Sequence, residues 1–115
     1  MDDAIKESNS WKNKFGDNSK FKGDVVEQLF IARVMREGYY CLKNVSSVGP
    51  IDCFIHNDVT YHFLDIKSIN SISRPLTKEK LLKLLTDQQK NMNVAIGYYD
   101  NGCAYVVSEE KILKI

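Results

Sequence analysis

The chain has 115 residues, a formal net charge of +1 and 43% hydrophobic residues, which is typical of one globular domain. This overall charge does not by itself indicate nucleic-acid binding, and the three cysteines are too widely spaced to indicate a disulfide framework. No apolar run approaches the ~20 residues that cross a bilayer, and the first residues lack a signal segment, so we expect a cytoplasmic protein without a membrane partner.

The first predicted helix lies near the start of a single domain. Residues 1–20 are polar, and we expect an N-terminal arm there, followed by one domain over residues 21–115. The apolar spacing is helical from Lys22 to Glu37, and Gly38 follows in the position that commonly ends helices.

Three strands are predicted after this helix. β-branched and aromatic residues are frequent at 39–45, 51–56 and 59–68. Asn57-Asp58 separates the last two runs and predicts a tight turn. These two strands would therefore form a hairpin.

The second half of the chain predicts one long helix and a second hairpin. Thr77 is suited to cap a helix over residues 78–92. The remaining predicted elements are strands at 94–100 and 103–108, joined at Asn101-Gly102, and a short tail helix capped by Ser108. The order αβββαββ predicts an α/β domain in which helices flank a mixed central sheet.

Charged residues stand inside the predicted 51–56 and 59–68 strands, where core residues are expected. Because side chains alternate along a strand, Asp65 and Lys67 share one face. Asp52 shares its face with Phe54, so hairpin pairing can make Asp52 a neighbour of Asp65. The pattern thus predicts two carboxylates and one ammonium group at one place.

The first helix offers a third carboxylate. Glu27 lies on the same helical stripe as Phe30 and Val34, and a buried lone carboxylate is costly unless it is paired or bound to a metal. Glu27, Asp52 and Asp65 together predict a site for Mg²⁺ or Mn²⁺, which prefer oxygen ligands. The alternative is a buried ion-pair network in which Lys67 neutralises Asp65.

The ordered set of Asp52, a gap, and Asp65-Ile66-Lys67 resembles the PD-(D/E)xK signature of the restriction-endonuclease-like nucleases. Within that superfamily the chain looks most like the archaeal-type Holliday junction resolvases. The stretches that carry this resemblance are "KGDVVEQLFIARVMREGYYCLKN" from Lys22, "SSVGPID" from Ser46 and "DIKS" from Asp65. The chain differs in having Asp at position 65, where many members have Glu.

The resemblance implies a metal-dependent DNA endonuclease with a restriction-endonuclease-like core. Metal ligands would be Glu27, Asp52, Asp65 and the backbone carbonyl of Ile66, and Lys67 would be the catalytic lysine. It also implies a homodimer that makes paired cuts in a four-way junction and leaves 5′-phosphate ends. DNA contacts would come from Lys22, Lys43, Ser46, Ser47, Arg74 and Gln88.

Gln88 has support from the residues as well, because it interrupts the apolar spacing of the predicted 78–92 helix. It would point to the catalytic centre, or else reach solvent or a backbone group. Two other functions remain open: a nicking, repair or restriction-type nuclease, and a catalytically silent DNA-binding module with the same fold.

Overall fold

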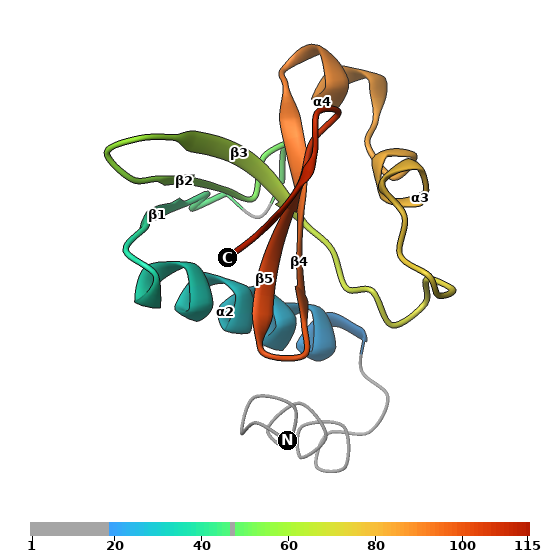
Figure 1. Ribbon diagram of the computed structural model, residues 1–115, viewed down its shortest axis with the longest axis horizontal. Helices are drawn as coiled ribbons and strands as arrows, with labels where there is room; N and C mark the ends of the chain where they lie inside the picture. Colours follow the sequence, from blue (N-terminus) through green and yellow to red (C-terminus); the bar gives the residue numbers. More distant parts are fainter. Residues whose placement is uncertain (1–18, 47) are drawn as a thin grey trace.

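The computed structural model describes residues 19–46 and 48–115. It is a compact α/β domain in which helices cover a six-stranded mixed sheet with the strand order β1-β2-β3-β4-β5-β6 (Figure 1). Among the strands of the described residues, only β3 and β4 pair in parallel. The elements are α2 (Ser19–Arg36), β1 (Tyr40–Lys43), β2 (Cys53–His56), β3 (Tyr61–Ile66), α3 (Lys78–Leu82), α4 (Asp87–Asn91), β4 (Val94–Asp100), β5 (Cys103–Val107) and β6 (Ile112–Lys114).

Helix α2 confirms the first predicted helix, although it begins three residues earlier. Its end is fixed by Gly38, which has a φ of 93°. The N–H of Gly38 donates to the carbonyl of Met35, and the N–H of Tyr39 donates to that of Val34. This is the Schellman arrangement, which needs a residue at positive φ and therefore favours glycine.

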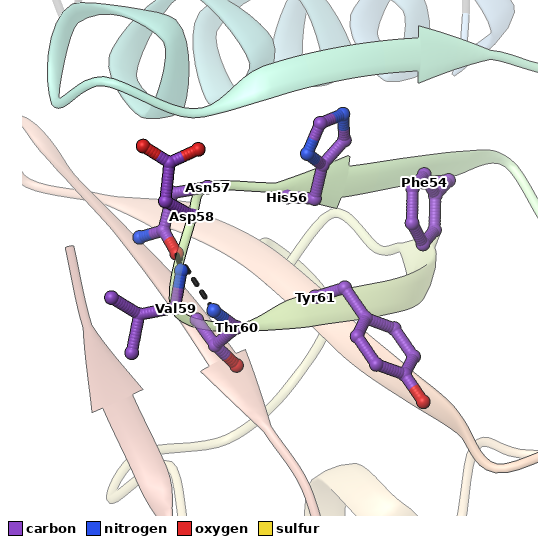
Figure 2. Close-up of a pocket in the computed structure, with 7 residues that line it drawn as sticks. All are labelled: Phe54, His56, Asn57, Asp58, Val59, Thr60 and Tyr61. Carbon is purple, nitrogen blue, oxygen red and sulfur yellow. Dashed lines mark hydrogen bonds between the residues drawn. The ribbon is translucent and has the colours of Figure 1, made fainter.

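The predicted hairpin of β2 and β3 is present, and Cys53 pairs with Leu64 in antiparallel register. Its turn is longer than the predicted two residues. The side-chain oxygen of Asn57 accepts the N–H groups of Val59 and Thr60 (Figure 2), which gives a four-residue connection from 57 to 60. The side chain of Asn57 therefore stabilises the turn by accepting backbone hydrogen bonds within it.

The prediction of one helix over residues 78–92 is wrong. Helix α3 ends at Leu82, and a new helix, α4, begins after Thr86. The hydroxyl of Thr86 accepts the N–H of Gln89, and the side chain of Gln89 accepts the N–H of Thr86. This reciprocal pair is a capping box, and it starts a helix within a run whose spacing looked continuous.

The predicted tail helix is also wrong, because the chain ends in strand β6. Val106 pairs with Leu113 in antiparallel register. Ala104 and Ile115 exchange two backbone hydrogen bonds beyond the strand. Leu113 and Ile115 pack against the core, so burial of alternate residues outweighs the cap that Ser108 could have offered.

Each face of the sheet has its own core. Phe30 and Val34 of α2 are fully buried against one face, while Leu81 and Leu85 pack on the other face over β4 and β5. The ring of Phe30 would lie 2.9 Å from a Cβ at Gly97. A side chain at position 97 would therefore push α2 away from β4.

Among the described residues, no helix is long and apolar enough to span a membrane.

Candidate catalytic site

Asp52 and Asp65 meet where β2 begins and β3 ends. The N–H of Asp52 donates to the carbonyl of Leu64 over 2.8 Å, and the Oδ2 of Asp52 accepts the N–H of Ile66 over 2.7 Å. The neighbouring Asp65 carboxylate also raises the pKa of Asp52. The predicted pairing of these two carboxylates is confirmed.

Lys67 lies beside this pair. Its ammonium group is 3.3 Å from the Oδ2 of Asp65, and its backbone N–H donates to the carbonyl of Gly97 on β4. The side chain of Asp65 is almost buried, whereas that of Lys67 is partly exposed. The ammonium group is thus held near the carboxylates but remains open to solvent and to a ligand.

The pKa of Asp52 is raised from 3.8 to about 6, mainly by burial and also by the neighbouring Asp65, while the N–H of Ile66 lowers it. Ionising Asp52 places a second negative charge beside Asp65, which is unfavourable. A bound cation would offset this cost. A nearby positive charge, such as the ammonium group of Lys67, therefore favours the ionised pair.

Gln89 is the site residue that the sequence reading missed. It is 7% exposed, and its Nε2 donates to the Oδ2 of Asp65 over 3.0 Å and to the carbonyl of Pro50 over 2.9 Å. Its Oε1 accepts the N–H of Thr86. One side chain therefore fixes Asp65, the loop before Asp52 and the start of α4.

Replacing Gln89 with alanine is expected to lower the free energy of unfolding by about 1–3 kcal/mol, because buried polar partners lose their hydrogen bonds. Gln88→Ala is the matched control, since Gln88 is exposed on the same short helix. It should change stability by less than about 0.5 kcal/mol. Urea unfolding measures both, and equal losses in the two variants would contradict the role of Gln89.

Glu27 does not join the two aspartates. It lies on the α2 side of the sheet, where its carboxylate is 3.5 Å from the ammonium group of Lys43. Asp65 points to the opposite face, toward α4. The negative charge of Glu27 contributes only the last of the effects that raise the pKa of Asp52, so the expected convergence of three carboxylates is not observed.

The described part of the chain contains no group of three or more His, Cys, Asp or Glu side chains placed to hold a metal ion. The donors that are present are the two oxygen-bearing side chains of Asp52 and Asp65. Mg²⁺ is commonly bound by one or two carboxylates, with water and substrate phosphates completing its shell. The aspartate pair fits that pattern, whereas a cage made by the protein alone is absent from these residues.

The loop before Asp52 is organised by Asn44. Its Nδ2 donates to the carbonyls of Val48 and Ile51, and its Oδ1 accepts the N–H of Ser46. Ser46 is exposed, as a substrate contact would need to be. The other predicted serine, Ser47, lies outside the described residues, as do the side chain of Lys22 and the arm up to residue 18.

Two other predicted DNA contacts lie away from the aspartate pair. Arg74 makes two hydrogen bonds of 2.9 Å to the carboxylate of Asp100. Asp100 is four residues beyond Ile96, the register partner of Asp65, which is about 13 Å along the strand. Gln88 is exposed and not on the buried face, because the break at Thr86 rotates the helix and brings Gln89 inward.

Comparisons of this chain with protein families, with curated proteins and with solved structures found no match.

Proposed function

We propose that the protein is a metal-dependent DNA endonuclease with a restriction-endonuclease-like core, and that it acts on branched DNA. The observation that carries the proposal is the placement of Asp52, Asp65 and Lys67 together at adjoining strand ends, where Asp52 accepts the N–H of Ile66 and Lys67 pairs with Asp65. These are the residues on which the resemblance to junction resolvases rests. The order of elements supports it, because a helix followed by strands with Asp and then Asp-x-Lys is the order on which the resemblance rests.

Phosphodiester hydrolysis needs groups that orient water and stabilise negative charge. In the proposed reaction, water attacks phosphorus in line, the bond from phosphorus to O3′ breaks, and the products carry 5′-phosphate and 3′-hydroxyl ends. The ammonium group of Lys67 orients the water and offsets the charge that develops on the phosphate. Gln89 holds Asp65 in one orientation through its 3.0 Å hydrogen bond.

Mg²⁺ is the cofactor that best suits the donors, and Mn²⁺ is expected to substitute. Asp52 and Asp65 would hold the ion, with the carbonyl of Ile66 as a further oxygen. When bound, a divalent ion supplies Lewis-acid stabilisation of the attacked phosphate. Glu27 is not in contact with the pair, so the proposal does not depend on it as a ligand.

A four-way junction is the substrate that we expect, and a homodimer would match its two-fold symmetry. The test is cleavage of a synthetic four-way junction with and without Mg²⁺. We expect cleavage only with the ion, and stronger competition by unlabelled junction than by linear duplex of equal length. Equal competition would favour a nicking, repair or restriction-type nuclease. If the junction is cut neither with Mg²⁺ nor with Mn²⁺, the proposal of a catalytic function is contradicted.

A further inference from the structure

An aromatic surface extends from the candidate site along the three strands of the first half of the sheet. One face of these strands carries six side chains, here called the aromatic face: Tyr40, Leu42, Phe54, His56, Tyr61 and Phe63. Asp65 continues the same row on β3. Catalytic candidates and aromatic rings therefore share one surface.

The rings contact one another across the strands. Tyr40 stacks on His56 with ring centroids 5.2 Å apart, and Phe54 lies 5.0 Å from Phe63 and 5.9 Å from Tyr61. Figure 2 shows Phe54, His56 and Tyr61 on the hairpin, with the hydroxyl of Tyr61 directed away from it. They form a continuous row of rings.

Tyr40, Leu42 and Tyr61 on this face are exposed, whereas Phe63 packs against the cluster that contains Leu81 and Leu85. α2 packs on the other face, α3 contacts β4 and β5, and α4 contacts β4. Tyr40 is 66% exposed and Tyr61 is 63% exposed. A shallow pocket of about 420 Å³ lies at the hairpin end, which is within the size range of small-ligand sites.

We propose that the aromatic face stacks unpaired bases of the nucleic acid that the candidate site cuts. The choice of nucleic acid over protein rests on the proposed function. Exposed rings on a sheet are a known platform for bases, because every base has a flat apolar face. Tyr61 is four residues from Asp65, about 13 Å along the strand, so stacked bases would lie only a few nucleotides from the scissile phosphate.

The composition of the aromatic face adds a second expectation. None of its six side chains belongs to Lys or Arg, so stacking supplies the affinity there. Binding of a single strand should then depend less on salt than binding of a duplex, which relies on phosphate contacts. The substrate class that follows is branched DNA with an unpaired segment.

The experiment measures binding of a fluorescein-labelled oligothymidylate of about 15 nucleotides by anisotropy, in EDTA so that no cleavage occurs. Tyr61→Ala and Tyr40→Ala should each weaken binding about tenfold, while Tyr61→Phe should bind as the wild type does. Met35→Ala is the matched control, because Met35 is 56% exposed on α2. It should leave affinity unchanged.

Unchanged affinity in both tyrosine-to-alanine variants overturns the inference. The inference is also overturned if Tyr61→Ala binds the oligothymidylate as the wild type does but sediments with a lower molecular mass. That result would show that the aromatic face binds a second copy of the chain. Cleavage of a fully paired junction by the wild type is measured separately. Cleavage of a junction with an unpaired segment is measured beside it. If neither DNA is cut while both variants lose binding, the proposed nuclease function is contradicted and the stacking surface stands.

Discussion

Lys67→Ala is expected to lower the rate of Mg²⁺-dependent junction cleavage by about 10³-fold, the size of effect seen when one electrostatic stabiliser of a transition state is removed. The ammonium group lies 3.3 Å from Asp65, so its loss removes the positive charge nearest to the proposed phosphate position. Asp65→Asn should have an effect at least as large, because a neutral amide is a poor ligand for Mg²⁺.

The measurement is single-turnover cleavage with protein in excess, so that the rate reports chemistry and not binding. Gel-shift assays in EDTA should show junction affinity within about threefold of the wild type. Lys83→Ala is the matched control, because Lys83 is an exposed lysine in the turn between α3 and α4. Full activity in Lys67→Ala or in Asp65→Asn would remove that residue from the catalytic centre.

Asp52→Asn is expected to stabilise the metal-free protein at pH 8 while it abolishes cleavage. The pKa of Asp52 is raised from 3.8 to about 6, first by burial, so the native state takes up a proton between about pH 4 and pH 6. The free energy of unfolding therefore falls as pH rises through that window. Asparagine does not titrate, and its oxygen can still accept the N–H of Ile66.

The gain should be absent near pH 4 and complete above about pH 7. A shift of about two pKa units corresponds to at most about 3 kcal/mol, and partial exposure reduces this to about 1–2 kcal/mol. Urea unfolding in EDTA at both pH values measures it, with the exposed turn residue Asp58 as the Asp58→Asn control. Equal free energies of unfolding for Asp52→Asn and wild type at pH 8 would show that ionised Asp52 does not destabilise the native state.

The strand alternation correctly predicted that Asp52, Asp65 and Lys67 lie close together. Asp65 and Lys67 share a face as expected, and the hairpin register brings Asp52 to Asp65. These relations are local, since a strand period of two and one hairpin determine them. The prediction for Glu27 failed because strand alternation does not say which face a helix covers, and its stripe partner Phe30 packs on the face opposite to Asp65.

What the sequence reading missed depends on tertiary contacts. The break between α3 and α4 is marked only by the Thr86-x-x-Gln89 capping box, which competed with continuous leucine spacing. That break decides whether Gln88 or Gln89 faces Asp65. Strand β6 likewise depends on its pairing with β5, in which Leu113 lies opposite Val106. No local signal in residues 108–115 specifies this pairing.

The strand order has a consequence for how the molecule folds. The sheet consists of two antiparallel meanders, β1-β2-β3 and β4-β5-β6, in which every pair is adjacent in sequence. The parallel β3–β4 pair alone closes the long connection through α3 and α4, so it carries the largest loop-closure entropy of any strand pair in the described sheet. We therefore expect the first meander, which contains both aspartates, to gain structure early, and Gln89 to reach Asp65 only when the two halves dock.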